Sequence, residues 1–450
     1  MLDDAANIGP EAAALIAYEA CVFFYPRVLL DEARRQHPAP ANQFHHDWGL
    51  SRRCVSHPNP QVLYSTAWLD LKSGPVVLSL PNLRAHQLLI SMIDARGRVF
   101  ASAGARETGA PACEIAIVGP DWAGGLGQGQ RALCAPTEHV WLVARTSVDP
   151  QGPESALTLQ PKLRLTPIRR QGAPPTPATP AAAVAGWPAR ACAEMDAAGF
   201  FRRLAGLLDT RPGSRADAVV MESLRRIGVV PGRPFDLGRL SPEVAQAVCD
   251  GAVRAQAVIA RPFGDGAEPW TAWARERGRG DDPLADARLA HSCIGLNLKE
   301  DAIYFLSERD SEGRPLNGAH RYRLHFDQFR TPQVETAWSL TAYDLNGALP
   351  AASGGRLGLS SRDRLRFNAD GSIDLRIQRD PPLDPLAANW TPCPPGDFRL
   401  ALRAYGPRHT VLSGLWRPPG VRRLHELGFR PGAEVDLSEI GAGVIPSHFA

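Results

Sequence analysis

The sequence predicts a mainly β protein in which a helical insert separates two β-rich regions. Short β-branched or leucine-rich runs, bounded by Gly, Pro or Asp, fill residues 62–170. From 190 to about 262 the apolar residues follow helical spacing, and after about 300 apolar and charged residues alternate again. Glycine and proline, 41 of each among 450 residues, favour many short strands and turns over long helical bundles.

The N-terminal third combines one helix with several strands. Residues 11–36 predict an amphipathic helix, which Pro26 should kink or end. Residues 40–60, rich in Pro, Asn and His, predict an irregular loop. Runs that are apolar on both faces indicate the buried strands of a sandwich, at 75–80, 88–93, 114–118 and 140–146.

The middle of the chain predicts a linker followed by helices. Five prolines between 172 and 188 favour an extended, exposed connector. Apolar stripes at 200–208 and 244–259 predict helices, the latter with Ser241 as N-cap and Pro242 at the first helical position. Because these stripes need apolar partners, we expect the helices to dock on a sandwich.

The C-terminal part predicts strands again. Asp370-Gly371 lies between two alternating segments, 364–367 and 373–377, and predicts a hairpin. Residues 398–402 predict another half-buried strand. The predicted units are therefore an N-terminal helix plus sandwich at 1–170, a linker at 171–189, a helical domain at 190–299 and a C-terminal sandwich at 300–450.

Charge and cysteine usage restrict the function class. Of 50 basic residues 47 are dispersed arginines and the formal net charge is +3, so no nucleic-acid partner is predicted. Glu19, Pro26 and Arg27 interrupt the most apolar stretch, residues 11–30, and no membrane span is predicted. The start lacks a basic signal-peptide region, and the eight cysteines form no C-x-x-C pair; both indicate a cytoplasmic protein.

Short motifs at both ends of the chain carry a family resemblance. The N-terminal motifs are Tyr25-Pro26, Asn42-Gln43-Phe44, Leu63-Tyr64-Ser65, Trp68-Leu69-Asp70, Val99-Phe100-Ala101-Ser102 and Pro136-Thr137. The C-terminal motifs are Arg321-Tyr322-Arg323-Leu324-His325-Phe326, Trp338-Ser339-Leu340-Thr341, Tyr343-Asp344, Asn368-Ala369-Asp370-Gly371-Ser372, Tyr405-Gly406-Pro407 and Trp416-Arg417-Pro418-Pro419. They resemble a bacterial family that pairs domain of unknown function 1254 (N-terminal) with domain of unknown function 1214 (C-terminal).

The resemblance implies an immunoglobulin-like β-sandwich, a small helical domain and a jelly-roll-like β-sandwich, and it implies no activity. Two segments depart from the family's pattern. Gln61 and Val62 stand where the family has a carboxylate and a hydroxyl, and Ser361 stands where it has a second carboxylate. We expect any chemistry that depends on those groups to be lost or altered.

Common catalytic motifs are absent from the sequence. It contains no G-x-S-x-G, H-E-x-x-H, Walker loop or complete G-x-G-x-x-G, which argues against standard hydrolase, zincin, P-loop and Rossmann enzymes. The sequence therefore identifies no particular cofactor. His37, His45, His46 and His57, with Asp47, cluster along the chain, but their spacing matches no metal motif and no metal site is predicted.

Candidate site residues lie at predicted strand ends. Asn59, Tyr64 and Trp68 are an amide, a phenol and an indole at a junction of loop and strand, and could hold a small polar ligand. The competing interpretation is that Tyr64 and Trp68 share one strand face and pack in the core. Arg145 and Arg321 are candidate anion-binding residues, or equally partners in structural ion pairs.

The sequence thus favours a protein that binds or processes a small polar or carbohydrate-like molecule between its two sandwiches. If it is an enzyme, Tyr64 or His46 is the candidate general acid–base. The alternative is a non-catalytic assembly or interaction protein. The sequence leaves open whether the protein forms a homo-oligomer. Neither nucleic acid nor membrane is expected as a partner.

Overall fold

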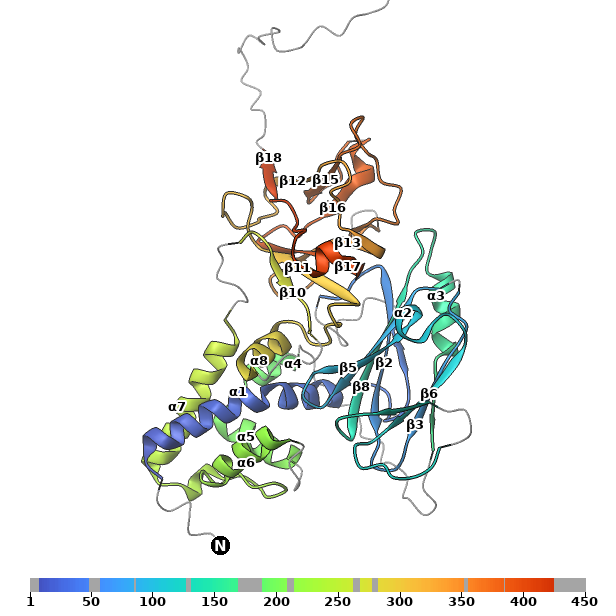
Figure 1. Ribbon diagram of the computed structural model, residues 1–450. Coiled ribbons are helices and arrows are strands. Elements are labelled where there is room, and N and C mark those ends of the chain that lie inside the picture. Colours follow the sequence, from blue (N-terminus) through green and yellow to red (C-terminus); the bar gives the residue numbers. More distant parts are fainter. Residues whose placement is uncertain are drawn as a thin grey trace, which may run out of the picture.

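The computed structural model describes residues 8–47, 57–84, 86–126, 131–168, 188–208, 214–261, 268–276, 282–351, 355–383 and 385–424. Figure 1 shows a β domain from the N-terminal third, a layer of helices beside it, and a β domain from the C-terminal third. This arrangement confirms the predicted fold class. The proline-rich segment 171–187 lies outside the described residues.

The N-terminal β domain consists of two sheets packed face to face. Their strand orders are β1-β2-β8-β4-β5 and β7-β6-β3-β9, and leucine, isoleucine and valine side chains fill the core between them. The strands are β1 His45–Asp47, β2 Val62–Asp70, β3 Val76–Leu80, β4 Leu88–Asp94, β5 Val99–Gly104, β6 Cys113–Val118, β7 Arg131–Cys134, β8 His139–Ser147 and β9 Arg164–Pro167. Two short helices, α2 Ala105–Thr108 and α3 Glu154–Leu159, flank them.

The first sheet of this domain is buried on both faces. Along β2, Ala67 and Leu69 face the second sheet, whereas Tyr64 and Trp68 face the helices. Trp68 stacks on Trp141 of β8, with ring centroids 5.3 Å apart. This arrangement explains why the strand predictions rested on continuous apolar runs rather than on alternation.

The helical layer is built around the N-terminal helix. Its helices are α1 Pro10–Arg35, α4 Pro188–Ala193, α5 Ala197–Leu207, α6 Arg215–Arg225, α7 Pro242–Ile259 and α8 Pro283–Ser292. Their apolar faces share one core with Trp68 and Trp141 of the first sheet, so the predicted docking of the helices on a sandwich is present. The side chain of Ser241 accepts from the backbone N–H of Val244, which confirms the predicted N-cap of α7.

Helix α1 bears on two expectations. Pro26 does not end it, because the helix is continuous to Arg35. By length and composition alone α1 could cross a membrane, contrary to the sequence-based expectation, but 67% of its most apolar 18-residue stretch is buried in the protein. Figure 1 shows why: α7 lies alongside α1, and the other helices surround it.

The C-terminal β domain again has two sheets, with strand orders β10-β11-β17-β13-β14 and β16-β15-β12-β18. Its core includes Phe305, Phe326, Trp338 and Leu402. The strands are β10 Thr271–Trp273, β11 Ala302–Ser307, β12 Arg321–Phe326, β13 Val334–Asp344, β14 Leu359–Ser360, β15 Ile373–Gln378, β16 Trp390–Pro392, β17 Phe398–Pro407 and β18 Arg422–Leu424, with the short helix α9 His409–Leu412. Strand β10 precedes the predicted boundary at residue 300.

The hairpin predicted around Asp370-Gly371 is only half present. The turn forms, because the Gly371 N–H donates to the Asn368 carbonyl and β15 follows it. The preceding segment 364–367 is not a strand. The side chain of Asn389 bonds both backbone groups of Arg366, accepting at 2.8 Å and donating at 2.7 Å, and takes the place of a neighbouring strand there.

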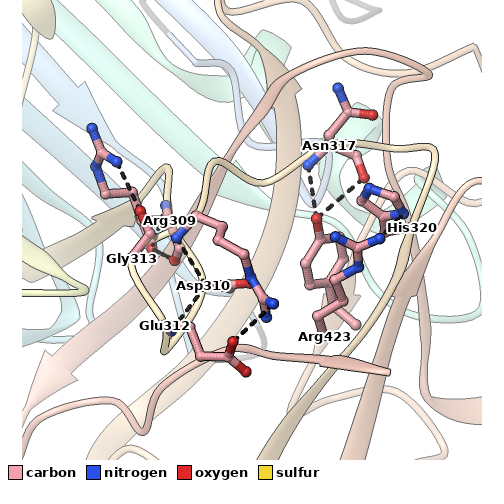
Figure 2. Close-up of polar contacts among 10 residues, drawn as sticks. Arg309, Asp310, Glu312, Gly313, Asn317, His320 and Arg423 are labelled. Atoms are coloured by element: carbon pink, nitrogen blue, oxygen red, sulfur yellow. Dashed lines mark hydrogen bonds and ion pairs between the residues drawn. The ribbon is translucent and has the colours of Figure 1, made fainter. Parts of the chain in front are cut away.

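A tight turn joins β11 to the segment leading into β12. In Figure 2, Arg309, Asp310, Glu312 and Gly313 form this turn, and Arg423 contacts His320 farther along. The buried carboxylate of Asp310 accepts from the backbone N–H groups of Glu312 and Arg314 and from the Arg314 guanidinium at 2.8 Å. Burial by itself would raise the pKa of Asp310, but these hydrogen bonds outweigh it and lower that pKa below its usual value.

We expect Asp310 to make stability depend on pH in the acid range. A carboxyl whose pKa is lowered by folding stabilises the protein above its unfolded pKa of about 3.9. That contribution is lost as the pH falls through the folded pKa. In urea unfolding, Asp310→Asn should therefore be less stable than the parent at pH 7, and the difference should shrink below about pH 4. A constant difference from pH 7 to pH 3 would contradict this role.

Candidate functional site

A cavity of about 230 Å³ lies where the two β domains meet. Ends of strands β2, β4, β5 and β8 form one wall, together with segment 147–150. Strands β13 and β17, with residues 300–301 and 360–363, form the other. Because both domains contribute, the cavity exists only in the assembled chain, and such junctions are where small-molecule sites collect.

Asn59 links the two walls. It is 2% exposed, and its side-chain N–H donates to the Tyr405 hydroxyl of β17 at 2.8 Å. A longer contact of 3.5 Å reaches the Ser339 hydroxyl. The backbone N–H of Asn59 donates to the Tyr64 hydroxyl at 2.9 Å. Asn59 thus connects the predicted residue Tyr64 to a tyrosine 341 positions later, which local sequence could not indicate.

Arg145 occupies the cavity wall beside Tyr64. The two residues are directly paired between β8 and β2, and the guanidinium lies 5.8 Å from the centre of the Tyr64 ring. Arg145 is 6% exposed; it donates to the Ser91 hydroxyl and to the Gly295 carbonyl. Of the predicted ligand-binding residues, Asn59 and Arg145 line the cavity. Tyr64 does not line it, but its hydroxyl accepts from Asn59 and its ring contacts Arg145.

Two other predicted residues lie elsewhere. Trp68 packs on Trp141 in the core shared with the helices. Arg321 is exposed on β12, in the sheet that does not contribute to the cavity. Neither of them lines the cavity.

The two candidate acid–base residues are on opposite faces of one sheet. His46 contacts Ser65 through its Nδ1, 2.8 Å from the hydroxyl, and stacks on Phe44. Tyr64, the next residue along β2, faces the other way. Burial raises the pKa of Tyr64 to about 12, although Arg145 opposes this, and burial lowers the pKa of His46. At neutral pH, Tyr64 is therefore a protonated hydrogen-bonding group rather than a base.

A second buried arginine lies behind the cavity. Arg403 of β17 is 2% exposed and donates to the Tyr343 hydroxyl at 2.7 Å and to the His57 carbonyl at 2.8 Å. The Tyr343 hydroxyl in turn donates to the Pro58 carbonyl at 2.8 Å. These bonds fix segment 57–59, which presents Asn59, on the C-terminal domain.

His57 is neutral in this environment. Its Nε2 lies 3.0 Å from the Arg399 guanidinium and accepts from it. Burial, reinforced by Arg399 and Arg403, lowers the pKa of His57 to about 3. Within the described residues no group of three or more His, Cys, Asp or Glu side chains is placed to hold a metal ion.

An ion pair closes the domain junction beside the cavity. The Arg106 guanidinium, 40% exposed, donates to the Asp301 carboxylate at 2.9 Å, and the Asp301 side chain is only 3% exposed. Asp301, Tyr405 and Ser339 were not among the predicted site residues. Tyr405 and Ser339 belong to motifs that carried the family resemblance, and this was their only signal in the sequence.

We expect Arg106→Gln to lower the free energy of unfolding by about 1 kcal/mol, because the buried Asp301 carboxylate loses a partner that is itself partly in solvent. The matched control is Arg190→Gln, which removes an exposed i,i+4 ion pair with Glu194 and should change stability by less than about 0.5 kcal/mol. Urea unfolding measures both. Equal effects would mean that the Arg106–Asp301 pair contributes nothing to domain coupling.

Comparison with known proteins supports the fold and the family. The model described as Protein of unknown function (DUF1254) matches residues 41–167, and the one described as Protein of unknown function (DUF1214) matches residues 301–409. No protein with a curated description matches the sequence.

Among solved structures, the VPA0106 protein from Vibrio parahaemolyticus superposes with a TM-score of 0.67 at 19% identity, covering 92% of this chain and 100% of its own. An uncharacterized protein from Burkholderia cenocepacia gives a TM-score of 0.44 at 14% identity, with coverages of 89% and 87%. The first likeness supports the arrangement of the whole fold. With both domain models matched in order along it, the chain belongs to the family that joins an N-terminal DUF1254 domain to a C-terminal DUF1214 domain.

Proposed function

We propose that the protein binds a small polar molecule, of about the size of a monosaccharide, in the cavity between its two β domains. The observation that carries this proposal is the composition of the cavity wall. Asn59, Arg145, Ser339 and Tyr405 bring an amide, a guanidinium and two hydroxyls from both domains to one partly open cavity. A few fixed polar groups in a concave site are what confer orientation and specificity on a small ligand.

The cavity volume restricts the ligand to a small molecule. A volume of about 230 Å³ lies just below the roughly 300–1,000 Å³ of pockets that hold drug-sized ligands. A polysaccharide or a peptide would have to lie mostly outside it. Tyr64 and His46 do not form an acid–base pair, so binding is proposed without a reaction.

The proposal is tested by placing a bulky side chain on the cavity wall, so that it fills part of the space a ligand would occupy. Ala105 is exposed and lines the cavity, so Ala105→Trp should fill part of it without disturbing a core. Ala132 on β7 is also exposed but remote, and Ala132→Trp is the control. A panel of sugars, polyols and small organic acids is screened by thermal shift, and each hit is titrated calorimetrically. We expect hits whose affinity falls at least about 10-fold with Ala105→Trp only.

Absence of any hit, or equal effects of the two tryptophans, would overturn the proposed function. The alternative of a self-assembling protein has its own supporting observation. Phe329 and Leu415 are 82% and 78% exposed on neighbouring loops, which the bond from the Trp416 indole N–H to the Arg330 carbonyl holds together. Light scattering of the parent and of a Phe329→Ser, Leu415→Ser variant tests it: a monomer in both cases rejects assembly through these loops.

We also propose that the protein functions in the cytoplasm. All seven described cysteines are free thiols, and four of them are buried, as expected in a reducing compartment. Helix α1 contributes many buried residues to the helical core, which supports a mature chain that keeps this helix. Cell fractionation should recover the chain with α1 intact in the cytoplasmic fraction; recovery of a chain cleaved after α1 from an exported fraction would contradict this.

A further inference from the structure

We propose that the ligand of the interdomain cavity is a small monocarboxylate, whose anionic group is held by Arg145, Tyr405 and Ser339. This inference rests on the proposed function and specifies the chemical class of the molecule. It depends on which polar groups of the cavity wall still lack a partner, and on whether those groups would donate or accept a hydrogen bond.

The first observation is the charge of Arg145. A guanidinium carries five N–H donors, and Arg145 uses two of them, on the neutral Ser91 hydroxyl and the Gly295 carbonyl. No carboxylate pairs with it among the described residues. A cation buried to 94% without a counter-charge is costly, and a bound anion would offset that cost.

The other arginines of the cavity wall differ from Arg145 in this respect. Arg106 is paired with Asp301, and Arg362 is paired with Asp149 at 2.9 Å. Their positive charge is already neutralised by the protein. Arg403, behind the wall, is also buried without a carboxylate partner in the described part of the chain, and it adds positive potential near Tyr405 and Asn59.

The second observation concerns two hydroxyl groups that line the same cavity as Arg145. Tyr405 and Ser339 each accept from the Asn59 side chain, at 2.8 and 3.5 Å. Neither hydroxyl has a protein acceptor for its own proton in the described residues. Asn59 therefore orients two further donors, and together with Arg145 they form a set of donors without acceptors. Such a set complements an oxyanion.

Acidic side chains in the cavity wall limit how negative the ligand can be. Glu300 and Glu335 are among the lining residues, and so is Glu107, which is paired with Arg106 at 3.0 Å. Their carboxylates oppose a dianion such as a phosphate monoester, whereas a single carboxylate can pair with the Arg145 guanidinium. The planar guanidinium also matches the geometry of a carboxylate.

The experiment compares matched probes on the full chain. Acetate, benzoate and glucuronate are titrated beside their neutral amides acetamide, benzamide and glucuronamide, with inorganic phosphate as a further probe. We expect at least one carboxylate to bind at least about 10-fold more tightly than its amide, and more tightly than phosphate. Its affinity should fall about 10-fold or more with Arg145→Gln and about threefold or more with Tyr405→Phe.

The control variant is Arg362→Gln, which removes another cavity-wall arginine that is not part of the proposed anion site. Because it leaves Asp149 unpaired, it should lower the affinity by about threefold at most, well below the effect of Arg145→Gln. If Arg145→Gln fails to fold, Tyr405→Phe and Ser339→Ala still test the donor set. Equal effects of Arg145→Gln and Arg362→Gln, tighter binding of phosphate, or binding of neutral compounds only would overturn this inference and leave the proposed function standing. Failure of every compound in the wider panel would overturn the proposed function itself.

Discussion

Replacing Gly251 with alanine is expected to lower the free energy of unfolding by about 2 to 3 kcal/mol. Gly251 lies in α7 where this helix crosses α1. A Cβ atom there would lie 2.2 Å from the carbonyl oxygen of Ala14 and 3.0 Å from the Cβ of Ala17. The obstacle is backbone, which cannot rotate aside, so the two helices must separate. This cost exceeds the roughly 1 kcal/mol that alanine gains over glycine inside a helix.

The matched control is Gly206→Ala in α5, where an added Cβ would meet no atom within 4 Å. There the helix propensity acts alone, and we expect a gain of up to about 1 kcal/mol. Urea unfolding at neutral pH should therefore give shifts of opposite sign for two chemically identical substitutions. If Gly251→Ala is neutral or stabilising, α1 and α7 do not cross at this glycine.

The close crossing of α1 and α7 illustrates what sequence could and could not predict about the fold. Both helices were predicted within one or two residues, from apolar spacing and from the cap at Ser241. Their association was not predicted, because α1 was assigned to the N-terminal unit and α7 to the helical domain. More than 200 residues separate the two helices along the chain. Small residues at a helix crossing give no signal until the partner helix is known.

The segment before Asp370-Gly371 shows a different limit. Its alternation of Arg364, Leu365, Arg366 and Phe367 is typical of a strand. A strand also needs a neighbour for its backbone groups, and here one asparagine side chain, Asn389, supplies that pairing at Arg366. Alternation predicts which side chains are buried, and here even that prediction is wrong for Phe367, which is 56% exposed. It gives no information on the partners of the N–H and C=O groups.

The candidate site was predictable on one wall only. Tyr64 and Arg145 lie at strand ends in the same sheet, and reading them as site residues required only short-range patterns. Trp68 and Tyr64 share one face of β2 and both pack in the core shared with the helices. Tyr64 is also linked to the C-terminal domain, because Asn59 bonds both its hydroxyl and that of Tyr405. The other wall, with Tyr405 and Asp301, comes from the C-terminal domain. Its place in the site depends on how the two whole domains pack together, which no local pattern encodes.

The contact between the domains leads to the second large effect. Tyr343→Phe is expected to lower the free energy of unfolding by about 2 kcal/mol. The hydroxyl of Tyr343 donates to the Pro58 carbonyl and accepts from the Arg403 guanidinium, and all three groups are buried. Phenylalanine keeps the ring and its packing but leaves a carbonyl and a charged donor each without this partner. The effect should appear in urea unfolding followed by tryptophan fluorescence.

Tyr304→Phe is the matched control, because both tyrosine rings lie beside Arg403, at 5.5 Å for Tyr343 and 5.7 Å for Tyr304 from the guanidinium carbon to the ring centre. The Tyr304 hydroxyl has no hydrogen-bond partner in the described part of the chain, so its removal should change stability by less than about 0.5 kcal/mol. A second readout distinguishes domain coupling from general packing. Because segment 57–59 carries Asn59 to the cavity, Tyr343→Phe should also weaken the binding of any cavity ligand, whereas Tyr304→Phe should not. Equal losses of stability in the two variants would mean that the ring contacts with Arg403, rather than the Tyr343 hydroxyl, hold this segment in place.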